Sequence, residues 1–386
     1  MNAAGRTGRV FRAEAKKMGL LSAMLADKIE GTLACNHTME EIMEQHSEKK
    51  FDLITFGETM LRLSPPSNAR IFRSDVFEKH AGGAELNVAS GVSLLGLRTG
   101  IITRLPQNEL GVFVKNRIRF SSVSDDFIIY DTSPEARLGI YYYENGAYPR
   151  KPTVVYDRRH SSITKIKPEE IPADIYGKTR MFYTSGITLA LSENTRLLAI
   201  EMIEKFKAAG AQIAFDVNYR ANLWDEDTAR ATIEKILPNI DILFVSEESC
   251  RRMFRKEGTL QDMHREFCSD FPNIQIIASS MREVISPKIH SFTSLVYSKA
   301  EDTFYTEDSY KDIDVVDRIG SGDAYCSGVL FGLLKYGDPQ KAMEFGNATC
   351  ATKNTIRGDL PLSDFNEISS IIKGHQTKGK QSEMNR

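Results

Sequence analysis

Residues 317–323, with the sequence DRIGSGD, combine small residues with two carboxylates just before an apolar helical repeat. Glycine and serine let the backbone turn sharply, so that its N–H groups can face a bound anion. The following helix adds its partial positive end at the same place. A pure phosphate cradle would not favour the carboxylate of Asp323, but a site that takes a proton from a hydroxyl beside a phosphoryl group would. The segment therefore indicates phosphoryl transfer to an alcohol.

The helix expected after Asp323 fixes the position of this loop. Apolar residues recur at helical spacing from 326 to 334, and Gly337 ends the pattern. The N-terminus of the helix therefore coincides with the glycine loop. Taken alone, the motif is also compatible with an ordinary tight turn that ends in an N-cap aspartate.

A second glycine pair, Gly82 and Gly83, opens another expected helix and places Asn87 one turn into it. Close approach of the backbone together with a side-chain amide suits a polyhydroxylated substrate. An ordinary junction between a loop and a helix is the alternative.

Arg220 closes the segment 216–220, DVNYR, after an expected strand. Its guanidinium could hold a carboxylate through two hydrogen bonds, or it could form a structural ion pair. Asn347, within a helix, could face a nucleotide or solvent. Asp359, in a loop near the end of the chain, could likewise contact a ligand or have only a structural role.

The elements that must position these residues alternate between strand and helix from residue 51 onward. Expected strands lie at 51–56, 100–103, 181–185, 212–216, 240–245 and 274–279, and expected helices at 85–95 and 192–209. Such alternation predicts an α/β fold with a doubly wound, mostly parallel sheet and helices on both faces. Ligands of such sheets bind beyond the carboxyl ends of the strands, where the polar clusters fall.

Two segments, 59–80 and 138–157, depart from this rhythm because they are extended and rich in aromatic and turn residues. They predict a small β element inserted into the α/β body. A lid over the site is one interpretation, and a passive edge hairpin is the other. Three successive tyrosines at 141–143 favour the lid, because aromatic rings with polar tips suit a wall that faces a wet ligand.

The composition of the 386 residues is 41% hydrophobic and 26% charged, with a formal net charge of -2, which is typical of a globular protein without a basic field for nucleic acid. No apolar run approaches the ~20 residues that span a bilayer. The five scattered cysteines suit free thiols in a reducing cytoplasm. Residues 1–50 predict a flexible or partly helical extension, and residues 375–386 a disordered tail.

The chain from 51 to 374 resembles the ribokinase/PfkB family of carbohydrate kinases, and within it the 2-keto-3-deoxygluconate kinases. Two motifs carry the family resemblance, at 82–89 (with Leu95 and Gly96) and at 317–324. The supporting segments are 57–65, 185–188, 216–220 with Leu223 and Trp224, and 355–359. The two motifs are specific for the family, whereas the assignment of the substrate rests on the weaker supporting segments.

The resemblance implies a ribokinase-like fold whose β lid often serves in dimerisation, with ATP and Mg²⁺ as cofactors. From the charge and the apolar pattern of the chain, no nucleic-acid or membrane partner is expected. The resemblance also implies Asp323 as the general base and the amides of Gly320, Ser321 and Gly322 as an anion hole. Expected contacts with an acidic sugar are Gly82, Gly83, Asn87, Tyr142, Arg220 and Asp359. Expected contacts with the nucleotide are Ser246, Glu248, Arg282 and Asn347. No direct metal ligand is expected, but Glu247 or Glu248 could support the metal through water.

Four parts of the sequence depart from the family pattern. Arg318 and Ile319 stand where many members have threonines, and Glu144 stands where some members carry a substrate arginine. The segment 279–282 replaces a glycine-rich nucleotide turn, and 246–249 replaces an Asn-x-x-Glu motif.

The expected reaction is ATP-dependent phosphorylation of 2-keto-3-deoxygluconate at its terminal hydroxyl, giving 2-keto-3-deoxy-6-phosphogluconate. A kinase for another sugar, such as fructose, is the nearest alternative, and Arg220 would then have no anion to bind. A catalytically silent sugar-binding protein is the alternative from another class.

Overall fold

The computed structural model describes residues 49–377. The predicted extension 1–50 and tail 375–386 lie, except for their inner edges, outside the described residues. Both remain predictions, as does the boundary of the kinase domain at 51–374.

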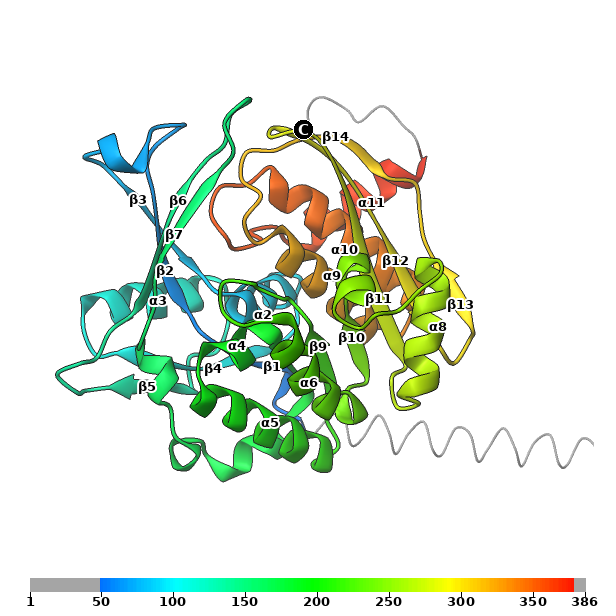
Figure 1. Cartoon of the computed structure of the whole chain (residues 1–386), viewed down its shortest axis with the longest axis horizontal. Coiled ribbons are helices and arrows are strands. Elements are labelled where there is room, and N and C mark those ends of the chain that lie inside the picture. Colours follow the sequence, from blue (N-terminus) through cyan, green and yellow to red (C-terminus); the bar gives the residue numbers. More distant parts are fainter. Residues whose placement is uncertain (1–48, 378–386) are drawn as a thin grey trace, which may run out of the picture. The chain divides into compact units, whose positions relative to one another are not determined.

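Ten strands in the described part of the chain form the central sheet, in the order β13-β12-β11-β10-β9-β8-β1-β4-β5, with β14 paired to β12 (Figure 1). Their bounds are β1 (Phe51–Phe56), β4 (Thr99–Pro106), β5 (Ile128–Asp131), β8 (Thr179–Ser185), β9 (Gln212–Asp216), β10 (Ile242–Phe244), β11 (Ile276–Ser286), β12 (Ile289–Ser298), β13 (Thr303–Tyr305) and β14 (Tyr310–Asp314). All pairs from β5 to β11 are parallel, whereas β12 pairs antiparallel with its neighbours. The predicted mostly parallel α/β sheet is confirmed.

Helices cover both faces of this sheet because its strands are apolar on both sides. In β8, Phe182 packs into one layer, whereas Met181 and Tyr183 pack into the other. The first layer holds α5 (Glu193–Ala208), α6 (Glu226–Ile236) and α8 (Leu260–Asp270). The second holds α2 (Ala84–Leu94), α9 (Ser321–Tyr336) and α10 (Pro339–Asn354). The other α-helices in residues 49–377 are α3 (Glu109–Phe120), α4 (Gly186–Leu191), α7 (Glu247–Arg252) and α11 (Phe365–Thr377).

The two segments that depart from the alternation, 59–80 and 138–157, supply a separate sheet of four strands in the order β3-β2-β6-β7 (Figure 1). Its strands are β2 (Met60–Ser64), β3 (Glu78–Gly82), β6 (Gly139–Glu144) and β7 (Thr153–Asp157). We call it the lid sheet. Its role as a lid and its use in dimerisation remain predictions.

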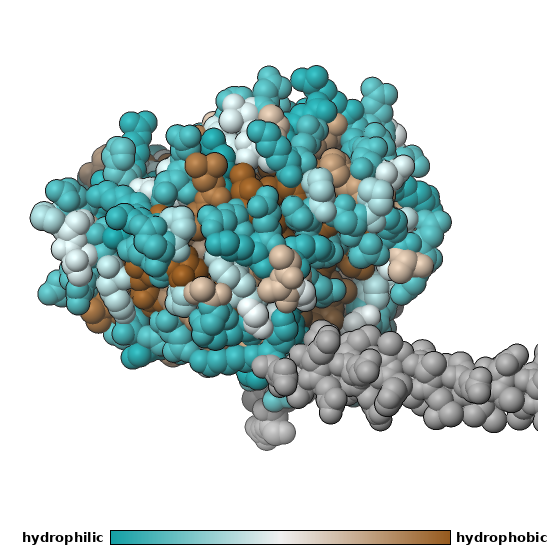
Figure 2. Space-filling model, turned by 90° about the horizontal axis from the view of Figure 1, so that it is seen from below, coloured by the Kyte–Doolittle hydropathy of each residue, from teal (hydrophilic) through white to brown (hydrophobic). Residues whose placement is uncertain are grey.

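Hydrophilic side chains cover most of the face shown in Figure 2, and hydrophobic ones show between them. Among the described helices, none is both long and apolar enough to cross a bilayer. The apolar residues instead fill the layers on either side of the central sheet.

Candidate active site

The glycine loop between β14 and α9 turns into the helix at Gly320, whose backbone φ is 82°. A Cβ at this position would be strained and would overlap the carbonyl oxygen of Asp359. Because the N-cap residue is a glycine, no side chain of residues 49–377 caps α9, although the amide of Ser321 donates to the carbonyl oxygen of Arg318 at 3.2 Å. A Cβ added to Gly322 in that first turn would meet no described residue within 4 Å apart from the neighbouring backbone of its own helix. The uncapped amides and the positive helix end are suited to bind an anion.

Asp323 lies in the first turn of α9 and contacts α2. Its Oδ2 accepts a hydrogen bond of 2.6 Å from Nδ2 of Asn87. Burial raises the pKa of Asp323 to about 6, although the hydrogen bond from Asn87 and the charge of Arg220 oppose the shift. At neutral pH this carboxylate is mostly ionised and is a stronger base than an exposed aspartate. It therefore has the properties of a general base.

A cavity of about 370 Å³ opens beside Asp323 and is lined from both the lid sheet and the α/β body. It brings together many of the residues predicted from separate motifs. These are Gly83, Asn87, Arg220, Arg282, Gly320, Ser321, Gly322, Asp323 and Asp359. Arg282 was predicted to contact the nucleotide, but the structure places it with the residues predicted to contact the sugar. The cause is the β11–β12 hairpin, in which β11 continues well beyond the expected strand end at residue 279.

Arginines that form no ion pair with the described residues distinguish this cavity. Arg220, Arg282 and Arg318 line it, and within residues 49–377 none of them forms an ion pair. In contrast, Arg158 in the same wall is paired with Glu58. Burial and the neighbouring Arg318 lower the pKa of Arg282, as expected for crowded cations. The cavity is therefore suited to an anionic ligand such as a carboxylate or a phosphoryl group.

Two further carboxyl groups in the wall carry less than a full negative charge at neutral pH. Burial raises the pKa of both Glu85 and Asp216 to about 7. The Oε1 atom of Glu85 accepts hydrogen bonds of 2.7 Å from the hydroxyls of Ser185 and Thr188. Since both acids are partly protonated at neutral pH, they offset only part of the charge of the arginines.

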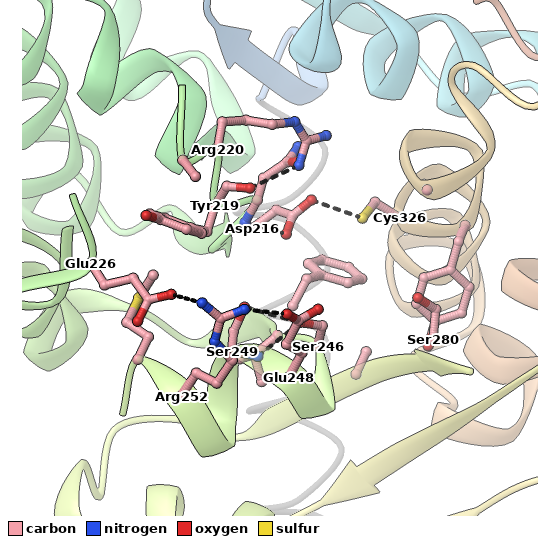
Figure 3. A pocket seen from close by; sticks show the side chains of 18 residues that line it. Asp216, Tyr219, Arg220, Glu226, Ser246, Glu248, Ser249, Arg252, Ser280 and Cys326 are labelled. Atoms are coloured by element: carbon pink, nitrogen blue, oxygen red, sulfur yellow. Dashed lines mark hydrogen bonds and ion pairs between the residues drawn. The ribbon is translucent and has the colours of Figure 1, made fainter. Parts of the chain in front are cut away.

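A second cavity, of about 500 Å³, adjoins the first (Figure 3). The two cavities share the lining residues Asp216, Asn218, Arg220 and Gly322. Ser246 and Glu248, predicted to contact the nucleotide, line the second cavity. The two cavities meet at the first turn of α9. Transfer of a group between two bound molecules requires such an arrangement of adjoining sites.

The two glutamates considered for metal support lie differently. Glu248 lines the second cavity and its Oε1 accepts from Nη1 of Arg252 at 2.7 Å (Figure 3). Glu247 lines neither cavity and pairs with Arg251 at 2.7 Å. In residues 49–377 no three His, Cys, Asp or Glu side chains are grouped to hold a metal ion.

Tyr142, predicted to contact the sugar, does not line either cavity. Its ring packs against Phe77, with 5.8 Å between the ring centroids. Successive side chains of a strand face opposite sides, so its neighbour Tyr141 lines the first cavity instead and donates a hydrogen bond to Asp359. Gly82 also lines neither cavity, but a Cβ there would overlap the carboxylate of Asp359. This glycine makes room for that carboxylate.

Asn347, predicted to contact the nucleotide, is fully buried in α10 and lines neither cavity. Its Nδ2 donates to Oε1 of Glu307 at 2.8 Å, and its Oδ1 has no partner among the described residues. The inner face of α10 packs against the sheet, which accounts for this burial.

Arg62 in the lid sheet lies in the supporting segment 57–65, but the sequence assigns it no role in the site. Only 1% of it is exposed. Its guanidinium forms ion pairs with Asp317 at 2.7 Å and with Asp359 at 3.1 Å. These ion pairs join the lid sheet to the start of the glycine loop, at Asp317, and to the late loop that contains Asp359. The only signal in the sequence is a charged residue within an apolar strand, MLRLS.

A family model described as pfkB family carbohydrate kinase matches residues 50–280. The chain belongs to this family. This pfkB kinase is 34% identical to the 2-dehydro-3-deoxygalactonokinase of Haloferax volcanii, over 84% of the chain and 97% of the relative. It is similar to the solved 2-dehydro-3-deoxygluconokinase of Thermotoga maritima, with a TM-score of 0.80 and 32% identity over 85% of this chain and 99% of that one. A putative ribokinase II of E. coli, solved in complex with ATP and Mg²⁺, shares the fold with a TM-score of 0.73 and 20% identity over 84% of this chain and 100% of that one. The pfkB kinase is therefore a phosphotransferase with a ribokinase-like fold, and its relatives support a sugar acid as the acceptor.

Proposed function

We propose that this kinase transfers the γ-phosphoryl group of ATP to the terminal hydroxyl of 2-keto-3-deoxygluconate, the sugar acid also called 2-dehydro-3-deoxygluconate. One observation carries the proposal. A basic carboxylate, Asp323, faces a cavity that also holds the start of α9 and three arginines without ion-pair partners in residues 49–377. Some of these arginines would bind the phosphates of ATP. If the acceptor were a neutral sugar, the other arginines would have no anion to bind.

In the proposed reaction, the sugar hydroxyl loses its proton to the carboxylate of Asp323 while its oxygen attacks the γ-phosphorus. The bond from that phosphorus to the bridging oxygen breaks, and ADP leaves. Asn87 holds the carboxylate in place, and the amides of residues 320–322 stabilise the charge on the moving group. When bound with the nucleotide, Mg²⁺ would neutralise phosphate charge near Glu248.

Arg220 is the proposed partner of the sugar carboxylate. It lines both cavities and has no ion-pair partner in the described residues, so it can turn toward a ligand without breaking a salt bridge. A hydrogen bond to a charged group is worth about 1.5–3 kcal/mol. Loss of this contact should raise KM roughly 10-fold to 100-fold.

The epimeric acid 2-dehydro-3-deoxygalactonate is a second candidate, because the relative from Haloferax volcanii carries that name at 34% identity. The two acids share the carboxylate, the ketone and the terminal hydroxyl. Arg220 and Asp323 would therefore act alike on both, and other side chains of the wall would discriminate between them.

The test is ADP release with both sugar acids, fructose and ribose as acceptors. We expect kcat/KM to be highest for one of the two acids. Arg220→Ala should raise KM for the acid far more than for any neutral sugar that reacts. Arg230→Ala, on the surface of α6 and paired with Glu234, is the matched control and should change neither.

Three results would contradict the proposal. Preference for a neutral sugar would favour the kinase for another sugar. Equal effects of Arg220→Ala on acidic and neutral acceptors would remove the carboxylate contact. Sugar binding in calorimetry without ADP release from any acceptor would indicate a silent sugar-binding protein.

A further inference from the structure

Lys353, near the end of α10, is a buried cation that the reaction described above does not use. Only 1% of it is exposed, although lysine is almost never fully buried without a partner. Its Nζ donates to the carbonyl oxygens of Asp317 and Ile356, both at 3.1 Å. Peptide carbonyls hold this ammonium in place, and such oxygens can also replace the hydration shell of a free monovalent cation.

The surroundings of Lys353 contain a balanced set of charges. Burial lowers the pKa of Lys353, and the carboxylates of Asp317 and Asp359 oppose that shift. Arg62 pairs with both carboxylates. Two buried cations therefore balance two buried anions. Loss of Lys353 would leave net negative charge directly behind a loop that has to bind a phosphoryl group.

Hydrogen bonds of Asp317 connect Lys353 to the glycine loop. Its Oδ1 accepts from the amide of Ile319 at 3.1 Å, and its Oδ2 accepts from the amide of Gly358 at 3.0 Å. Its own amide donates to the carbonyl oxygen of Asn354 in α10 at 3.1 Å. The start of the loop is thus fixed to the end of α10 by backbone bonds and by the ammonium.

We propose that Lys353 is a positioning residue for phosphoryl transfer: its ammonium fixes the start of the glycine loop and balances the carboxylates behind it. The same carbonyl site takes a small monovalent cation when the side chain is removed. This proposal rests on one part of the proposed function, namely that the glycine loop binds the transferred phosphoryl group. It does not depend on which sugar accepts that group.

The test compares Lys353→Ala and Lys353→Met with the wild type, using the best acceptor of the sugar panel. A displacement of about 1 Å in a catalytic group can cost about 100-fold in rate. We therefore expect kcat to fall roughly 10-fold to 100-fold in both variants, with little change in the KM of the sugar. Ammonium chloride should restore at least part of the kcat of Lys353→Ala. Tetramethylammonium chloride at equal ionic strength is too large for the site and should not.

Lys341→Ala is the matched control, because Lys341 lies on the same helix, has an exposed side chain, and pairs with the buried Glu344. It should lose no activity and should not respond to ammonium. Wild-type kcat in folded Lys353→Met, or a loss in Lys353→Ala that ammonium does not relieve, would overturn the proposal.

Two readouts do not depend on turnover. The thermal midpoint of Lys353→Ala should rise with ammonium but not with tetramethylammonium, so a wrong acceptor would not hide the effect. If neither variant folds, nitrogen NMR of the wild-type lysines decides the question. A protected, charged NH₃⁺ signal from Lys353 at neutral pH is expected, and a neutral amine would overturn the proposal.

Discussion

Asn87 and Asp323 lie 236 residues apart in the chain, yet their side chains share a hydrogen bond of 2.6 Å in the wall of the first cavity. Nδ2 of Asn87 donates to the carboxylate, while Oδ1 of the same amide is buried without a partner in the described residues. A buried acceptor without a partner is costly unless a ligand satisfies it. We therefore infer that a substrate hydroxyl donates to Asn87 and lies next to the base.

Asn87→Ala should move the acid limb of the pH profile to higher pH. Asp323 acts as a base only when ionised, so activity is lost as the pH falls through its pKa, which is about 6 in the wild type. The hydrogen bond from Asn87 lowers that pKa, and its loss lets the value rise. The measurement is kcat against pH. Asn108→Ala, which removes the N-cap of the surface helix α3, should leave the profile unchanged.

Tyr141→Phe and Tyr142→Phe should differ although the two residues are adjacent in β6. Tyr141 lines the cavity and donates to Asp359, whereas Tyr142 packs against Phe77. We expect Tyr141→Phe to raise the KM of the sugar several-fold, and Tyr142→Phe to leave it unchanged. The reverse order would mean that the lid strand presents its other face to the substrate.

Arg62→Leu should destabilise the fold by about 3–5 kcal/mol, because it leaves Asp317 and Asp359 buried without their cation. Urea unfolding measures the change. Lys50→Ala is the control, since its pair with Asp126 is exposed on both sides and should be worth less than ~1 kcal/mol. Equal losses in the two variants would show that the buried triad does not hold the lid sheet to the loop.

The local parts of the fold and of the site follow from the sequence. Glycine at 320 and 337 brackets α9, and Ser192 caps α5, because backbone conformation and capping depend on neighbours in the chain. Asp323 and Asn87 could be recognised for the same reason, because the helix starts that contain them follow from neighbouring residues in the chain.

The remaining parts of the site depend on contacts between distant segments. Tyr141 and Tyr142 cannot be told apart until the register of β6 is known, since one step exchanges the faces of a strand. Arg282 reaches the first cavity only through the long β11–β12 hairpin. The partners of Arg62 lie far along the chain, so no local pattern predicts the triad.

Asp323→Asn tests the central claim most directly, because the change removes the base and preserves the shape of the side chain. General-base assistance is worth about 10²–10⁴-fold. We expect the single-turnover rate of phosphoryl transfer to fall by at least 100-fold, with little change in ATP affinity measured by calorimetry. A folded Asp323→Asn variant that transfers the phosphoryl group at nearly the wild-type rate would contradict the account.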